Sequence, residues 1–319
     1  MIAPLKKLIV CLDHTDMDQE LIENACSISK IAGTTQITFL NVIREFNMPE
    51  AVLKEFPHLM DKALDERKRE IKGLIENHFK CDVPTKILVR QGGETKEILK
   101  AADEIKSDLI ILGKKKVSDS VLSTRVARRS PCNMLIIPQG SELKFDKIFI
   151  PVDFSDYSSL SLKRTLMLTE KLKSKIYLQN VYQVPSSYRY SGKTYEEFAD
   201  IMKGHATKDL EVLIKKADKK NQELIPVCSL DKDGKIVDLV IKEAKKKNVD
   251  LIVMGAKGRT ATSAIFIGSK SERMIRMNDS IPLMIIRKKG AIAGILESIM
   301  DLNQHATLNT TLLICLIGY

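Results

Sequence analysis

Short apolar runs alternate with longer segments of helical periodicity along most of the chain. Each run is short enough for one buried strand, and most are followed by a segment whose apolar residues recur at helical spacing. Strands that are apolar on both faces belong to parallel sheets covered by helices on both sides. The pattern therefore predicts an α/β fold.

Four of these strands occur twice, in the same order. The first strand ends at Asp13 and returns 140 residues later, ending at Asp153. The other pairs are Ile37–Val42 with Ile176–Val181, Asp108–Gly113 with Asp250–Gly255, and Met134–Ile137 with Leu283–Ile286. A further strand in each half, Thr85–Val89 and Glu223–Cys228, gives five strands per half. Such a repeat indicates a tandem duplication, with domains at 1–138 and 146–288, a linker at 139–145 and a tail at 289–319.

The loop after the fourth strand of the second half has the composition of a phosphate site. Gly255 and Gly258 follow the strand, and nine residues after Gly258 come Gly268 and Ser269, where a helical pattern begins. Glycines let a loop approach a ligand closely, and the N–H groups of a first helical turn attract anions. The spacing predicts a nucleotide's phosphate site, and the alternative is a structural loop without ligand.

Four side chains around this loop have two interpretations each. Lys257 and Arg259 either steady phosphate charge or are only solvated. Ser269 either caps the helix or binds phosphate or a metal-bound water, and it can do both. Asp153 either caps the next helix or contacts ribose or adenine, because parallel sheets bind ligands at the carboxyl ends of their strands.

The corresponding loop of the first half is shorter. The offset between matched strands rises from 142 residues before the loop to 149 after it, so about seven residues are missing between Gly113 and Met134. Gly113-Lys-Lys-Lys116 stands where the second half has Gly255-Ala-Lys-Gly258. We therefore predict that the halves share a fold but not a site.

With these motifs, the chain resembles the universal stress protein family, specifically its tandem-domain members. The resemblance rests on the second-half glycine pattern and on Pro151-Val152-Asp153 with Ser155. It implies two flavodoxin-like or adenine-nucleotide α-hydrolase-like domains, each a five-stranded parallel sheet between helices, packed as an intramolecular pseudo-dimer. It also implies ATP, with or without Mg²⁺, in the second domain. The implied binding residues are Pro151, Val152, Asp153, Val181, Met254, Gly255, Gly258, Gly268 and Ser269, and the loop cations Lys257 and Arg259 complete the predicted set.

Composition narrows the class of protein. A chain of 319 residues with 44% apolar and 29% charged residues is typical of a soluble globular protein. The six cysteines include no CxxC pair, so we expect buried reduced thiols and a cytoplasmic location. The net charge of +10 comes mostly from lysines mixed with acids in helical segments, and aromatics make up only 5%. We therefore expect no nucleic-acid partner, and no apolar stretch is long enough for a membrane span.

The function expected from these features is a nucleotide-dependent stress-response or signalling module with an unidentified protein partner. No general base and nucleophile lie at a recognisable spacing, so no catalytic residue is predicted. A slow Mg²⁺-dependent ATPase, a nucleotide-free interaction scaffold and a homodimer all remain open. The tyrosines at 182, 188, 190 and 195 are expected to pack a loop or an interface rather than bind a cofactor.

Overall fold

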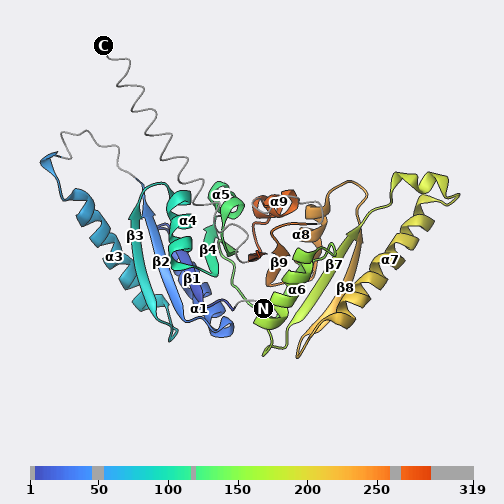
Figure 1. The fold of residues 1–319 in the computed structure, drawn as a ribbon, viewed down its shortest axis with the longest axis horizontal. Coiled ribbons are helices and arrows are strands. Elements are labelled where there is room, and N and C mark those ends of the chain that lie inside the picture. The colour runs from blue at the N-terminus through green and yellow to red at the C-terminus, as the bar shows by residue number, and fades with distance from the viewer. Residues whose placement is uncertain (1–3, 45–53, 116–119, 259–266, 289–319) are drawn as a thin grey trace, which may run out of the picture.

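The computed structural model describes residues 4–44, 54–115, 120–258 and 267–288 (Figure 1). Arg259 and the tail at 289–319 lie outside the described residues. The elements of the first half are β1 (Lys7–Leu12), α1 (Met17–Ala32), β2 (Gln36–Ile43), α3 (Leu59–His78), β3 (Thr85–Gln91), α4 (Glu94–Ile105), β4 (Leu109–Lys114), α5 (Val121–Arg129) and β5 (Asn133–Pro138).

The second half repeats this order. Its elements are β6 (Lys147–Pro151), α6 (Asp156–Leu168), β7 (Lys175–Tyr182), the short 3-10 helix η1 (Ser186–Tyr190), α7 (Tyr195–Lys216), β8 (Glu223–Leu230), α8 (Ile236–Lys246), β9 (Leu251–Gly255), α9 (Ser269–Met277) and β10 (Leu283–Ile286). The four repeated strand pairs predicted from the sequence are all present, which confirms the α/β fold.

All ten strands form one sheet, in the order β3-β2-β1-β4-β5-β10-β9-β6-β7-β8. Within each half every pairing is parallel, as predicted. The two halves meet where β5 pairs antiparallel with β10, with Leu283 opposite Ile136 and Ile285 opposite Met134. The sequence predicted two five-stranded sheets, but it did not predict that they join edge to edge.

Successive residues of each strand face opposite sides of the sheet, and this builds two cores. In β1, Leu8 and Val10 pack on one side with α1, α3, α6 and α7, whereas Ile9 and Cys11 pack on the other side with α4, α5, α8 and α9. Figure 1 shows α5 and α9 side by side at the middle of the molecule, with α3 and α7 at its outer ends. Strands buried on both sides explain the continuous apolar runs in the sequence.

The duplication extends to unusual backbone conformations. His14 and Phe154, which occupy matched positions after the first strand of each half, have φ of 62° and 59°. Lys106 and Asn248, which are also matched, have φ of 55° and 49°. Non-glycine residues seldom adopt this left-handed conformation, so its recurrence at the same places shows that the two halves share loop geometry as well as strand order.

The expectation that the cysteines are reduced thiols is wrong for two of them. Cys26 of α1 and Cys81, which lies after α3, form a disulfide with their Cα atoms 5.8 Å apart. Cys11 and Cys132 are buried free thiols whose pKa values are raised by burial. In the described part of the chain, no helix is both long and apolar enough to cross a membrane.

Candidate functional site

A cleft of about 1160 Å³ lies at the carboxyl ends of the strands of the second half. Small-molecule sites in proteins usually measure roughly 300–1,000 Å³, so this cleft has room for a nucleotide. The structure places ten of the eleven predicted binding residues around it, and Arg259 is the residue outside the described ranges. The ten are Pro151, Val152, Asp153, Val181, Met254, Gly255, Lys257, Gly258, Gly268 and Ser269.

The strand order explains why these residues meet. In the sheet β6 lies between β9 and β7. The chain runs outward from β6 through β7 to β8, and it then crosses back to form β9 on the other side of β6. Crevices at such reversals are where open α/β sheets bind ligands. Here the loop after β6 faces the glycine loop after β9 across the reversal.

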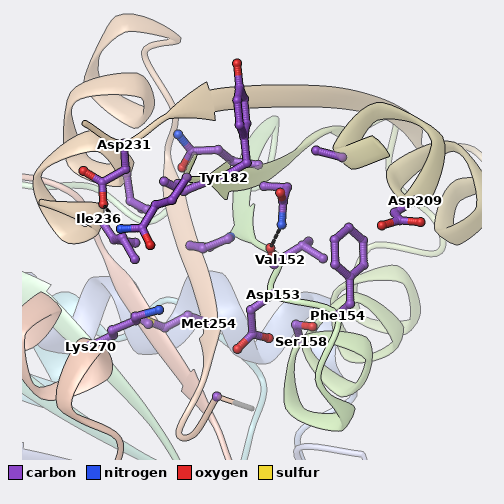
Figure 2. Close-up of a pocket in the computed structure, with 18 of the residues that line it drawn as sticks. Val152, Asp153, Phe154, Ser158, Tyr182, Asp209, Asp231, Ile236, Met254 and Lys270 are labelled. Atoms are coloured by element: carbon purple, nitrogen blue, oxygen red, sulfur yellow. Dashed lines mark hydrogen bonds between the residues drawn. The ribbon is translucent and has the colours of Figure 1, made fainter. Parts of the chain in front are cut away.

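Asp153 enters the cleft from the loop after β6. This loop is anchored to β7, because Val152 N donates to Gln179 O at 2.7 Å and Asn180 Nδ2 donates to Val152 O at 2.8 Å (Figure 2). Ser155, not Asp153, caps α6, since its hydroxyl accepts from Ser158 N. The carboxylate of Asp153 accepts from Ser155 N at 3.1 Å through Oδ1.

The other oxygen of Asp153 lies against the glycine loop. A Cβ added at Gly258 would stand 2.7 Å from Asp153 Oδ2, closer than real Cβ contacts come. A Cβ added at Gly255 would stand 2.6 Å from Tyr157 Cβ and 3.1 Å from the Tyr157 carbonyl carbon in α6. The first glycine of the loop, Gly255, is therefore required by helix packing, and Gly258 lets the loop approach the carboxylate.

The two ends of the glycine loop are tied together where α9 begins. Gly268 N donates to Ala256 O at 2.7 Å, and Ser271 Oγ donates to Gly255 O at 2.8 Å. The expectation that Ser269 caps the helix is wrong, because the N-cap is Gly268 and Ser269 is the first helical residue. Among the described residues no side chain caps α9. Since the first N–H groups of a helix lack intrahelical acceptors, this end of α9 has the character of an anion site.

Two lysines add positive charge on this side. Lys257 lines the cleft but is only 7% exposed, so the interpretation of a freely solvated side chain is wrong. Burial, and secondly the nearby Arg287, lower the pKa of Lys257. Lys270 in the first turn of α9 also lines the cleft, and Figure 2 shows it near Met254. Lys270 was not predicted as a site residue, although its place directly after Gly268-Ser269 was an available signal.

The wall of the cleft formed by β7, α7 and the segment after β8 includes residues that were not predicted from the sequence to belong to the site. They include Tyr182 at the end of β7, Asp209 in α7 and Asp231 after β8 (Figure 2). Asp231 is buried and accepts from Gln183 Nε2 at 2.8 Å and Lys235 N at 2.9 Å, which orders this wall. The rings of Tyr188 and Tyr195 meet edge to face at 5.5 Å, which agrees with the expected packing role, but Tyr182 and Tyr195 also line the cleft.

The sequence and the fold have known relatives. The model of the Universal stress protein family matches residues 4–138 and again 144–287. The chain belongs to the universal stress protein family. Over 154 residues it is 27% identical to a universal stress protein of Methanocaldococcus jannaschii, which covers 48% of this chain and 88% of that protein.

Solved universal stress proteins share the two-domain fold. One from Archaeoglobus fulgidus superposes with a TM-score of 0.60 at 18% identity, covering 88% of this chain and 98% of that structure. A putative universal stress protein from Pseudomonas aeruginosa gives a TM-score of 0.58 at 14% identity, covering 92% and 97%. The tandem universal stress protein domains of this chain thus form a pseudo-dimer within one polypeptide.

The first universal stress protein domain uses the same strand ends differently. Asp13, which matches Asp153, lies 3.7 Å from Lys115 Nζ and accepts from Thr15 Oγ1 at 2.5 Å. The Met17 side chain fills the space beside Gly113, 2.9 Å from where a Cβ would stand. The carboxylate that faces a glycine in the second domain is thus paired with a lysine in the first. Among the described residues, no group of three or more His, Cys, Asp or Glu side chains in either domain is arranged to hold a metal ion.

Proposed function

We propose that this protein binds ATP in the cleft of its second domain and does not bind it in the first. The observation that carries the proposal is the contact across the sheet reversal. There a glycine loop approaches the Asp153 carboxylate, and α9 begins at Ser269 after an N-cap, Gly268, that no described side chain supplements. A carboxylate at one end and the N–H groups of a first helical turn at the other fit a ligand with a polar base and an anionic tail.

The residues divide between the parts of the nucleotide. Asp153 and Val181 would hold the adenosine, with Met254 and Gly255 beside it. The backbone of Gly258 would hold the ribose, and that of Gly268 and Ser269 at the start of α9 would hold the phosphates, with Lys257 and Lys270 adding positive charge. Arg259 joins this set from the sequence alone, as a positive charge in the glycine loop. A Mg²⁺ ion, where present, would be bound to the phosphates of the nucleotide.

The role that fits such a site is a cytoplasmic stress-response or signalling module whose protein contacts depend on nucleotide occupancy. Membership of the universal stress protein family supports this role. In this role, nucleotide binding in the cleft controls the contacts of the protein with its partner. The first domain provides structural support and a surface for those contacts.

Calorimetric titration of the full chain with ATP tests the proposal. We expect one site per chain, and we expect Gly258→Val to weaken binding by about 100-fold or more, because its side chain must displace Asp153. The matched control is Gly73→Val in α3, where a Cβ would meet no atom within 4 Å. Two equal sites, or full affinity in Gly258→Val, would refute the proposal. Phosphate release measured on the same samples separates binding from slow hydrolysis.

A further inference from the structure

Lys114, the last residue of β4, connects the first domain to the second. Its side chain is buried, with the residue 6% exposed, and reaches the end of α9. Lys114 Nζ donates to Ile275 O at 2.7 Å, to Arg276 O at 2.9 Å and to Asn278 O at 2.7 Å. The lysine that stands where the second domain has Ala256 is therefore used in the contact between domains.

The geometry of this contact is that of a helix cap. An ammonium group has three N–H donors, and all three are used here. The last carbonyls of a helix have no intrahelical donor, and a cation at this end also interacts favourably with the helix dipole. Burial lowers the pKa of Lys114, and a buried charge is tolerated when it is fully hydrogen-bonded, as this one is.

A second contact holds α9 near its other end. Arg128 of α5 forms a two-pronged ion pair with Glu272 in the first turn of α9, with Nε to Oε2 at 3.1 Å and Nη2 to Oε1 at 2.7 Å. Helices α5 and α9 lie side by side (Figure 1). The first domain thus contacts α9 at both ends, in addition to the contacts that α9 makes within its own domain.

The capping is reciprocal. Arg287, which lies directly after β10, is buried and donates to Ala127 O and Arg128 O at the end of α5. Each domain therefore caps the last helix of the other with a buried cation. Of these two helices, α9 is the one whose first residues line the cleft, so the cap by Lys114 acts on a helix whose N-terminus enters the candidate site.

We propose that the first domain regulates the phosphate site of the second domain, with Lys114 as the positioning residue that acts through α9. This inference rests on the proposed ATP site. Helix α9 has nine residues, so about 13 Å of rigid helix separates the cap from Ser269. A change of the contact between the domains would move or loosen α9 and so alter phosphate binding, whereas adenosine binding at Asp153 and Val181 would stay the same.

The test compares ATP with adenosine on the full chain. In Lys114→Met, which keeps the aliphatic stem and removes the ammonium, we expect ATP affinity to fall about tenfold while adenosine affinity stays within about twofold. Ile71→Ala is the control, because Ile71 is buried in α3 at the outer end of the first domain. It should destabilise that domain without changing the ratio of ATP to adenosine affinity.

Hydrogen exchange of the unmodified protein provides a test without substitution. Because coupling between sites is reciprocal, ATP should slow exchange at residues 274–278 more than adenosine does. Equal ATP affinity in Lys114→Met and the unmodified protein, or parallel losses for ATP and adenosine, would overturn the inference and leave the ATP site intact. Absence of ATP binding to the unmodified protein would refute the proposed site itself, and the inference with it.

Discussion

The two domains share strand order and fold but differ at the end of the fourth strand. After β9 the chain forms a glycine loop beside Asp153, whereas at the end of β4 it carries Lys114 and Lys115. Lys115 pairs with Asp13, and Lys114 leaves its own domain to cap α9. The same position in a duplicated fold has thus become a candidate ligand site in one copy and a contact between domains in the other.

This difference separates the positions that are the same in both copies of the fold from those that differ. The glycine at the end of the fourth strand remains in both domains, because it packs against the first turn of the helix after the first strand, at Met17 in one and Tyr157 in the other. The residue after that glycine is used differently in the two domains: Ala256 is buried in the core, whereas Lys114 reaches across to α9. Packing therefore accounts for the glycine in both domains, whereas the residues that follow it differ.

The largest expected effect concerns that glycine. Gly255→Ala should lower the free energy of unfolding by about 2–3 kcal/mol, because the new Cβ meets the backbone of α6. The matched Gly113→Ala should cost less than about 1 kcal/mol, since its Cβ meets the flexible end of Met17. Denaturant unfolding of the two variants measures the difference. Equal losses would show that the two glycines have the same role.

A smaller effect is expected from a residue that differs between the first turns of α1 and α6. Asp18, where the second domain has Ser158, is buried and accepts from Asp13 N and His14 N. Burial raises the pKa of Asp18 to about 6 from 3.8. The folded state therefore holds this proton more tightly than the unfolded state, and the contribution of Asp18 to stability falls as the pH rises from about 4 to about 7.

Asp18→Ser should remove this dependence. We expect the unmodified protein to be more stable relative to the variant at pH 4 than at pH 7, by about 2 kcal/mol in the free energy of unfolding. Chemical denaturation at the two pH values measures this difference. A difference of the opposite sign would mean that the two backbone hydrogen bonds outweigh the cost of burial.

The smallest effect compares the two aspartates. Asp153→Ala should weaken adenosine binding about tenfold, or about 1.4 kcal/mol, by removing a hydrogen-bond acceptor from the cleft. Asp13→Ala should leave it unchanged, because Asp13 is paired with Lys115 in the other domain. Titration with adenosine distinguishes the two. Equal weakening by both substitutions would contradict the assignment of the site to the second domain.

Much of the fold and part of the candidate site can be predicted from local patterns. The paired strands, the spacing of Gly255, Gly258 and Gly268, and the shorter loop of the first half are visible in the sequence, because each depends on residues close together in the chain. That Gly268, and not Ser269, is the N-cap of α9 was not visible in the sequence, because it depends on where the loop closes onto Ala256.

The sequence by itself determined that this protein is a duplicated α/β fold of the universal stress protein type with glycine loops of different length. Only the tertiary structure decided that the two sheets join through β5 and β10, that Cys26 reaches Cys81, and that Lys114 caps α9. The reason is physical. Hydrophobic periodicity reports how each segment meets the core, but a contact between residues far apart in the chain exists only once the sheet order has brought them together.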